Sequence, residues 1–213
     1  MEIKSDIEIV TGVLGSGKTS LINALLNINL IPKEKVLILQ EEIGGREIEK
    51  RFKQNSNIII RSISKEQPLT KEYFKYLANL HHPNRIIIEM DGTKNLEEML
   101  GILNESEIKK ISRISTVYYV AEAQNFENYL KSKNSFLIPL LTYSNLIILT
   151  KCIFLRKGQW ESIKLAIEDI NPKAFMLRAD SMGSIERVLK ESHLIDTGIL
   201  KKLRFKLNKI LCI

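Results

Sequence analysis

Seven short apolar runs, rich in Ile and Val, alternate along the chain with segments of helical spacing. Each run is nearly continuous, which is typical of a strand covered on both faces of a sheet, whereas the segments between them have the periodicity of amphipathic helices. The expected strands are residues 7–10, 36–39, 58–60, 85–88, 116–120, 146–149 and 174–177, and the expected helices are 20–26, 69–80, 95–103, 159–170 and 184–189. This alternation predicts the α/β class, with a largely parallel sheet of about seven strands flanked by helices and with ligands at the carboxyl ends of the strands.

A phosphate-loop pattern, GxxxxGK[ST], spans residues 12–19. It follows the first expected strand and opens the first expected helix, as the motif requires; the alternative is a glycine-rich turn that happens to precede a helix. Glycines let successive backbone N–H groups point at a phosphate, and the helix adds the positive end of its dipole. We expect Lys18 to reach the β and γ phosphates and the Thr19 hydroxyl to ligate Mg²⁺. The loop residues expected at the nucleotide are Gly12, Leu14, Gly15, Ser16, Gly17, Lys18, Thr19 and Ser20.

The 213 residues are 44% hydrophobic and 27% charged, a composition that excludes intrinsic disorder, collagen and a disulfide scaffold. A chain of this length buries enough apolar surface to be stable as one domain. Its two cysteines, Cys152 and Cys212, do not have the spacing of a metal knuckle, so we expect a reducing, cytoplasmic setting. No run reaches the roughly 18 apolar residues of a membrane span, and we expect neither a signal peptide nor a transmembrane helix.

The formal net charge of +7 is concentrated at the carboxyl end of the chain. Residues 201–213 hold five basic residues and no acid, which leaves about +2 for the rest and argues against a nucleic-acid-binding coat. Apolar residues of this end fall on one helical stripe, namely Leu200, Leu203, Leu207, Ile210 and Leu211. We therefore expect a nucleotide-binding domain at residues 1–198 and a basic amphipathic helix at 199–213. The helix is expected to pack on the domain; the alternatives are a membrane surface or an acidic partner.

Five segments, in order, resemble the CobW-type GTPases, which are relatives of the nickel chaperones HypB and UreG. Residues 11–23 look like that family's phosphate loop, and Glu41-Glu42-Ile43-Gly44 stands at the place of its Asn-Glu-Phe-Gly stretch. Residues 88–92 are similar to its Glu-x-x-Gly, residues 120–126 to its Val-Val-Asp-Ala and following Phe, and residues 171–174 to its Asn-Pro-x-Ala. The resemblance covers most of the chain. It implies a phosphate-loop nucleotide hydrolase domain that uses GTP and Mg²⁺ and assists a metal- or corrinoid-dependent client protein.

The resemblance also gives roles to two carboxylates and a glycine. Glu89 ends the third conserved strand, where a carboxylate can hold Mg²⁺ through water, and Gly92 lets a backbone N–H approach the γ phosphate. Each acid alone would be interpreted as solvated. At the carboxyl ends of successive strands after a phosphate loop, however, we expect both Glu42 and Glu89 to support the metal. The expected catalytic residues are thus Lys18, Glu42 and Glu89, and the expected metal-binding residues are Thr19, Glu42 and Glu89.

The base-selecting motif of the family, Asn-Lys-x-Asp, is replaced by Thr150-Lys151-Cys152-Ile153. We expect Thr150 and Lys151 to line the nucleotide site, with Lys151 along the face of a purine, and Cys152 to pack in the interior. Ile153 cannot accept a hydrogen bond, so the N–H groups of guanine lose their acceptor. The sequence therefore leaves GTP and ATP open and predicts a weak preference for guanine.

The family's metal-binding segment, Gly-Cys-x-Cys-Cys, is replaced as well. Ser62, Ser64 and Lys65 stand there, and hydroxyls beside an ammonium are poor ligands for a soft divalent cation. The adjacent pair His81-His82 is expected in a loop rather than at a metal. We therefore predict Mg²⁺ with nucleotide to be the only functional metal, and we expect the family's further C-terminal domain to be missing.

These features together favour Mg²⁺-dependent binding and slow hydrolysis of a purine nucleoside triphosphate. No residue stands out as the base that positions water, which fits a switch that needs a partner protein or a homodimer to hydrolyse quickly. The alternative is a regulatory module with little or no hydrolysis, in which bound nucleotide only sets the conformation shown to a partner. Nucleic-acid binding rests on the basic tail alone and is not favoured.

Overall fold

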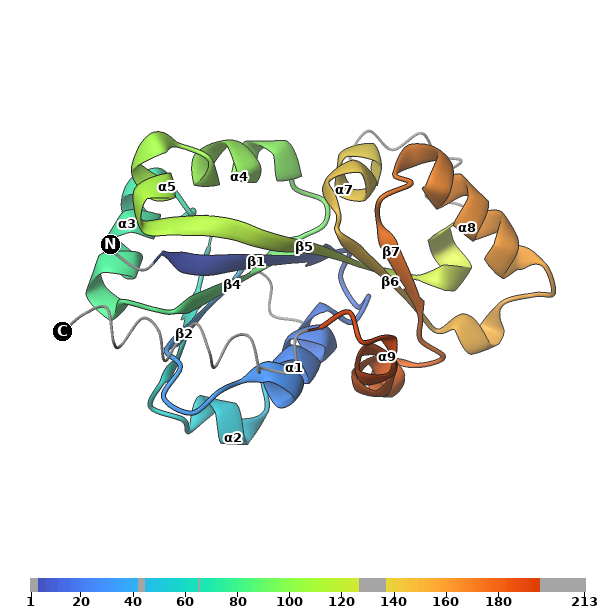
Figure 1. The fold of residues 1–213 in the computed structure, drawn as a ribbon, viewed down its shortest axis with the longest axis horizontal. Coiled ribbons are helices and arrows are strands. Elements are labelled where there is room, and N and C mark those ends of the chain that lie inside the picture. The colour runs from blue at the N-terminus through green and yellow to red at the C-terminus, as the bar shows by residue number, and fades with distance from the viewer. Residues whose placement is uncertain (1–3, 42–44, 65, 127–136, 196–213) are drawn as a thin grey trace.

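The computed structural model describes residues 4–41, 45–64, 66–126 and 137–195, which form one seven-stranded sheet with helices on both faces (Figure 1). Neighbouring strands are all parallel, in the order β3-β2-β4-β1-β5-β6-β7. The strands are β1 (Ser5–Gly12), β2 (Val36–Gln40), β3 (Ile58–Ser62), β4 (Arg85–Asp91), β5 (Ser112–Glu122), β6 (Leu146–Thr150) and β7 (Phe175–Arg178). The predicted α/β class and all seven predicted strands are confirmed.

Each of the five predicted helices is also confirmed. Helices α1 and α9 run further than predicted, and α3 and α4 begin later because a cap residue had been counted as helical. Thr70 and Asn95 lie just outside their helices, where their side chains accept hydrogen bonds from backbone N–H groups of the first turn. The described helices are α1 (Lys18–Asn29), α2 (Lys50–Lys53), α3 (Lys71–His81), α4 (Leu96–Leu103), α5 (Ser106–Ile111), α7 (Leu137–Tyr143), α8 (Gln159–Ile170) and α9 (Ile185–Ser192), with 3-10 turns η1 (Cys152–Phe154) and η2 (Met182–Ser184). Not one of these helices is long and apolar enough to cross a membrane.

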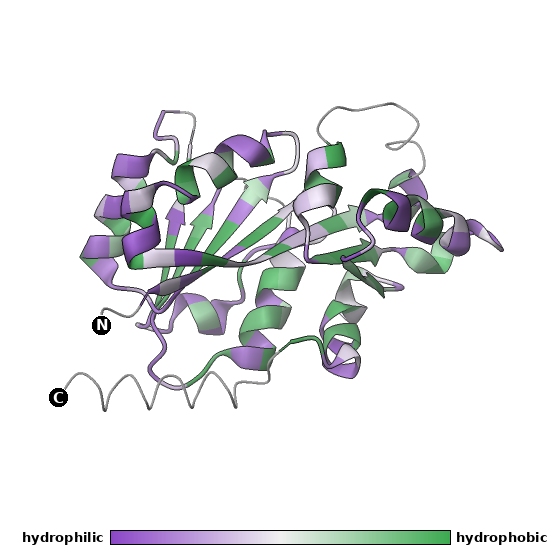
Figure 2. Cartoon of the chain, turned by 45° about the horizontal axis from the view of Figure 1, so that its top comes forward, coloured by the Kyte–Doolittle hydropathy of each residue, from purple (hydrophilic) through white to green (hydrophobic). Residues whose placement is uncertain are grey.

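The sheet separates two hydrophobic cores. Helices α3, α4, α5, α7 and α8 cover one face, whereas α1, α2 and α9 cover the other (Figure 1). Consecutive residues of a strand face opposite cores: Ile86 and Ile88 pack under the first group, and Ile87 packs under the second. Figure 2 shows the hydrophobic colour along the strands between the two helical layers. Burial on both faces is the physical reason that the strands are continuous apolar runs.

The register of the central strands brings three carboxyl ends together. Glu89 in β4 lies opposite Val10 of β1 on one side and opposite Gln40 of β2 on the other. The chain leaves β1 at Gly12, beside Asp91 at the end of β4, and enters α1 at Lys18. The phosphate loop therefore sits at the edge of the sheet where a parallel α/β fold binds its ligands.

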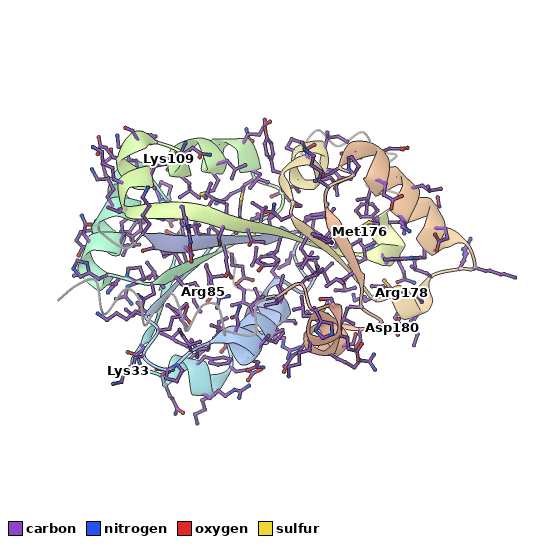
Figure 3. All side chains as sticks on the ribbon, in the orientation of Figure 1. Lys33, Arg85, Lys109, Met176, Arg178 and Asp180 are labelled. Atoms are coloured by element: carbon purple, nitrogen blue, oxygen red, sulfur yellow. The ribbon has the colours of Figure 1, made fainter. Side chains whose placement is uncertain are left out.

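A buried ion pair joins the same strands at their opposite, amino ends. Arg85 is 1% exposed, and it contacts the carboxylate of Glu8 and donates to Asn29 Oδ1 at 2.8 Å on the α1 side of the sheet (Figure 3). Burial by itself would lower the pKa of Arg85, but the charge of Glu8 and its hydrogen bond outweigh burial and raise it. The guanidinium of Arg85 thus stays charged inside the protein because Glu8 lies beside it.

We predict that Arg85→Ala lowers the free energy of unfolding by about 3–5 kcal/mol, because it leaves the Glu8 carboxylate buried without its partner. Arg113→Ala is the matched control, since Arg113 pairs with Asp6 at 2.6 Å between β5 and β1 with both side chains partly exposed. That change should cost less than about 1 kcal/mol. Urea denaturation measures both, and equal losses for the two variants would contradict the role given to the buried pair.

Candidate nucleotide-binding site

The loop between β1 and α1 is shaped by two glycines. A Cβ at Gly12 would lie 2.1 Å from the carbonyl oxygen of Val120, so only glycine lets β1 end this close to β5. Gly17 caps α1 with a φ of 114°, in the left-handed region that favours glycine. Between them the chain turns sharply, and the amino end of α1 faces the loop. Such a loop directs backbone N–H groups and the positive end of a helix dipole at one point.

Lys18 folds back over this loop. It is 4% exposed, and its Nζ donates to the carbonyl oxygens of Gly12 at 2.7 Å and Val13 at 3.2 Å. Both acceptors belong to the phosphate loop, so the backbone of the loop holds the ammonium in place. A phosphate entering the loop would meet a cation that is already in place.

Glu89 links three elements beside the loop. Its Oε1 accepts from the Thr19 hydroxyl at 2.6 Å, and its Oε2 accepts from Gln40 Nε2 at 2.5 Å. The carboxylate is 2% exposed, so α1, β2 and β4 meet at one buried negative charge. Gly92 follows, and its N–H donates to the carbonyl oxygen of Gly12 at 3.0 Å. The structure therefore brings together Thr19, Glu89 and Gly92, which the sequence assigned to one site.

A cavity of about 280 Å³ opens at this point. Its walls include the phosphate loop, the start of α1 and Glu89, as the sequence suggested. Three further lining residues were missed: Gly45 and Arg46, which follow β2, and Met182, which follows β7. The full lining is Leu14, Gly15, Gly17, Lys18, Thr19, Ser20, Gly45, Arg46, Glu89 and Met182. The sequence offered one signal for Arg46, a basic residue shortly after a strand that ends at the site, and our sequence-based prediction did not use it.

The residues proposed for the base lie next to the loop but do not line the cavity. Thr150 is buried, and its hydroxyl donates to the carbonyl oxygen of Ser16 at 3.0 Å, so it supports the loop from β6. Lys151 has a left-handed φ of 57° and pairs with Glu122 at the end of β5. Ile153 is 66% exposed, so an exposed apolar side chain stands where the family motif has its carboxylate.

Cys152 is completely buried, as its predicted packing role requires. Its thiol donates to the carbonyl oxygen of Leu149 at 3.2 Å, and its N–H donates to the carbonyl oxygen of Ala179 at 3.1 Å. Burial raises the pKa of the Cys152 thiol to about 11, so it is a neutral thiol at physiological pH. A neutral, enclosed sulfur is part of the interior and not a ready metal ligand.

Several predicted residues lie outside the described part of the chain, namely Glu42, Gly44, Lys65 and the proposed helix at 199–213. Glu41, the neighbour of Glu42, is described. Its N–H donates to the carbonyl oxygen of Glu89 at 3.0 Å, and its carboxylate accepts from the N–H of Asp91 at 3.3 Å and pairs with Lys94 at 3.2 Å. These contacts of Glu41 therefore tie the chain that leaves β2 to the end of β4.

Two of the positions compared with the family's metal segment, Ser62 and Ser64, are exposed. Ser62 ends β3, and the Ser64 hydroxyl accepts a hydrogen bond from the N–H of Gln67 at 3.2 Å. His81 is the last residue of α3 and not part of a loop, which corrects the sequence expectation, and His82 caps that helix. Burial, together with the charges of Arg61 and Lys35, lowers the pKa of His81. Within the described ranges, no group of three or more His, Cys, Asp or Glu side chains is arranged to hold a metal ion.

Comparison with known proteins decides the family. The model of the CobW/HypB/UreG nucleotide-binding domain matches residues 6–178, which include all seven strands except Ser5, the first residue of β1. The chain belongs to the CobW/HypB/UreG family. The matched region contains the phosphate loop, Glu89 and the segment 150–153, so the features described above are this family's nucleotide-binding domain in the form that this chain carries.

Relatives within and around the family differ in length. The zinc-regulated GTPase metalloprotein activator 1 of Dictyostelium discoideum is 25% identical over 241 aligned residues, which cover 92% of this chain and 49% of the relative. The chain thus spans about half the length of that relative. Two solved structures share the fold. The Zn(II)-bound YjiA GTPase of E. coli has a TM-score of 0.61 at 20% identity, covering 81% of this chain and 57% of that one. The hydrogenase maturation factor HypB of Archaeoglobus fulgidus has a TM-score of 0.57 at 14% identity, covering 89% and 90%.

Proposed function

We propose that this chain binds a purine nucleoside triphosphate together with Mg²⁺, hydrolyses it slowly, and thereby assists a metal- or corrinoid-dependent client protein. The single observation that carries the proposal is the arrangement at the mouth of the loop. A buried lysine and a buried Thr19–Glu89 pair flank one cavity at the amino end of α1. This set combines a buried cation, a hydroxyl and a carboxylate. Phosphate-loop proteins use these groups to bind the β and γ phosphates and their Mg²⁺.

Thr19 and Glu89 are the described residues that would hold Mg²⁺, with Glu42 proposed beside them. The fit rests on donor chemistry: hydroxyl and carboxylate oxygens are the ligands that Mg²⁺ prefers, and the two oxygens already lie 2.6 Å apart. When bound, Mg²⁺ supplies positive charge to the β and γ phosphate oxygens. Lys18 adds a second positive charge at the loop. Gly92 lets the end of β4 approach the loop, because a Cβ there would lie 2.4 Å from the carbonyl carbon of Gly12.

Slow hydrolysis follows from the partners of Glu89. One carboxylate oxygen accepts from Thr19 and the other accepts from Gln40, so both oxygens already hold hydrogen bonds and neither is arranged to take a proton from water. A partner protein or a second copy of the chain would be needed to complete the site. The same observation favours a second candidate function, a regulatory module in which nucleotide is bound and not usefully hydrolysed.

The client side of the proposal is supported by the family. The Dictyostelium relative is named as a metalloprotein activator, and one structural neighbour is a hydrogenase maturation factor. For this chain we propose a client that depends on a metal or a corrinoid, with Mg²⁺ and nucleotide as its own functional ligands. Zinc or cobalt carried at residues 61–65 is not part of the proposal, because hydroxyls are weak ligands for such ions.

Lys18→Ala is expected to abolish tight triphosphate binding with the fold intact, because it removes the cation held at the loop. Lys75→Ala is the control, since Lys75 pairs with Glu107 on the other face of the sheet. Calorimetry with GTP and Mg²⁺ measures the affinities, and circular dichroism verifies the fold. Undiminished binding by Lys18→Ala would show that the phosphate-loop interpretation is wrong. Phosphate release in a single turnover separates the hydrolase from the regulatory module.

Guanine preference is expected to be weak in the natural chain and to rise by about tenfold or more in Ile153→Asp, because aspartate restores an acceptor for the guanine N–H groups. The side chain is exposed, so the exchange should cost little stability. Ile153→Asn is the control, because its amide offers one acceptor oxygen and no charge. Competition of GTP with ATP measures the ratio. A natural chain that already favours GTP by about three orders of magnitude would contradict the assignment of this position.

A further inference from the structure

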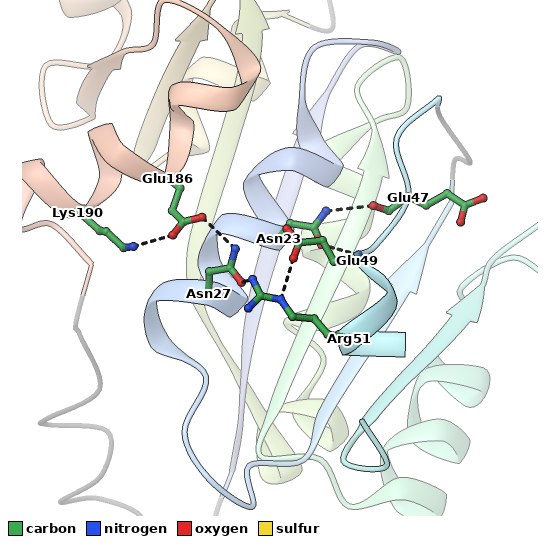
Figure 4. A network of polar contacts seen from close by, with 7 residues as sticks. All are labelled: Asn23, Asn27, Glu47, Glu49, Arg51, Glu186 and Lys190. Atoms are coloured by element: carbon green, nitrogen blue, oxygen red, sulfur yellow. Dashed lines mark hydrogen bonds and ion pairs between the residues drawn. The ribbon is translucent and has the colours of Figure 1, made fainter. Parts of the chain in front are cut away.

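One buried amide fixes the chain segment that follows the second strand. Asn23 in α1 is 2% exposed, and its Nδ2 donates to the carbonyl oxygen of Glu47 at 3.1 Å while its Oδ1 accepts from the N–H of Glu49 at 3.0 Å (Figure 4). Both ends of a single side chain thus hold the backbone on either side of Ile48. That residue is 3% exposed and packs in the core beneath α1. The segment is therefore anchored by a polar clamp and an apolar contact together.

Asn23 lies on the face of α1 that also carries Thr19, a residue of the cavity lining. Asn23 follows Thr19 by four residues, so the two side chains share one face of the helix, one turn apart. The segment that Asn23 holds therefore runs beside the Thr19 and Glu89 end of the cavity. Met182 lines the same cavity from a different part of the fold, the turn after β7. Gly45 and Arg46 immediately precede the clamped residues, and both line the cavity.

The other charged side chains of this segment are engaged elsewhere. The carboxylate of Glu47 pairs with Lys53, and the carboxylate of Glu49 accepts from Arg51 Nε at 2.8 Å. Arg51 also contacts Asn27 on α1, so this arginine is turned toward the helix surface (Figure 4). Arg46, in contrast, contributes to the wall of the nucleotide cavity. Arg46 is exposed, so it adds a second cationic side chain, beside Lys18, to the lining of a cavity that already holds the buried carboxylate of Glu89.

We propose that Arg46 is a nucleotide-binding residue that contacts the terminal phosphate, and that Asn23 is the positioning residue that places it there. This inference rests on the proposed nucleotide function. A guanidinium is always charged and offers paired N–H donors, which suit the oxygens of a phosphate. Asn23 holds the neighbouring backbone one helical turn from Thr19, so we assign Arg46 to the γ phosphate, which binds at the Thr19 and Glu89 side in the proposed function. Arg46 therefore favours a triphosphate over a diphosphate.

Calorimetry of the full chain with GDP and with a non-hydrolysable GTP analogue, both with Mg²⁺, tests the role of Arg46. Arg46→Ala should weaken binding of the triphosphate analogue by about tenfold or more and change GDP affinity by less than about threefold. Arg46→Lys should keep part of the preference because it keeps the charge. Arg113→Ala removes the same charge at the opposite end of the sheet and should leave both affinities unchanged. Equal losses for the two nucleotides, or no loss, would overturn the assignment.

Asn23→Ala tests the positioning role. It should reduce the preference for the triphosphate as Arg46→Ala does, and the double variant should lose no more than either single one, because both changes remove the same contact. A merely structural role would lower the melting temperature and leave the ratio of the two affinities intact, which would overturn this half of the proposal. Additive losses in the double variant would also do so.

The two levels of the account fail differently. If the natural chain binds neither nucleotide, the proposed function and this inference are both overturned. If it binds both nucleotides in a manner that requires Lys18 and ignores Arg46, the proposed function stands and this inference alone is wrong.

Discussion

The shared carboxylate of Glu89 is the interaction on which the candidate site depends. It is buried at the end of β4, and it accepts from Thr19 of α1 and from Gln40 of β2. A buried carboxylate is costly unless it is hydrogen-bonded, so these bonds hold the start of α1 and the ends of β2 and β4 together. The cavity opens where these three elements meet the phosphate loop.

The phosphate end of the site is built more completely than the base end. Lys18 is buried against the loop carbonyls, and Thr150 braces the loop through the carbonyl oxygen of Ser16. Toward the base, Lys151 pairs with Glu122 and Ile153 is largely exposed. In the proposed function, a site of this kind gains its affinity from phosphate and metal and little from the purine. Both ends of the site lie within the region that the CobW/HypB/UreG family model matches.

The sequence was sufficient for the parts of the structure that are local or that burial imposes. Runs such as Ile86-Ile87-Ile88 are continuous because each face of the sheet is covered. The phosphate loop is recognisable because its residues, 12–19, are consecutive in the sequence. Helices α2, α5 and α7, of four, six and seven residues, were missed because so short a helix shows little periodicity. Arg46 was missed for another reason. The segment that carries it is held by the bond from Asn23 to the carbonyl oxygen of Glu47, which joins positions 24 residues apart, so a basic residue after a strand was the only local signal for it.

The dependence of triphosphate binding on Mg²⁺ tests the central claim most directly. A non-hydrolysable GTP analogue is titrated into the natural chain and into Thr19→Val, each with Mg²⁺ and again with excess EDTA. The account predicts that Mg²⁺ strengthens binding to the natural chain by about tenfold or more, and that the valine variant loses most of this gain because the hydroxyl is absent. Equal affinity with and without Mg²⁺ in the natural chain, or a full gain in the variant, would contradict it.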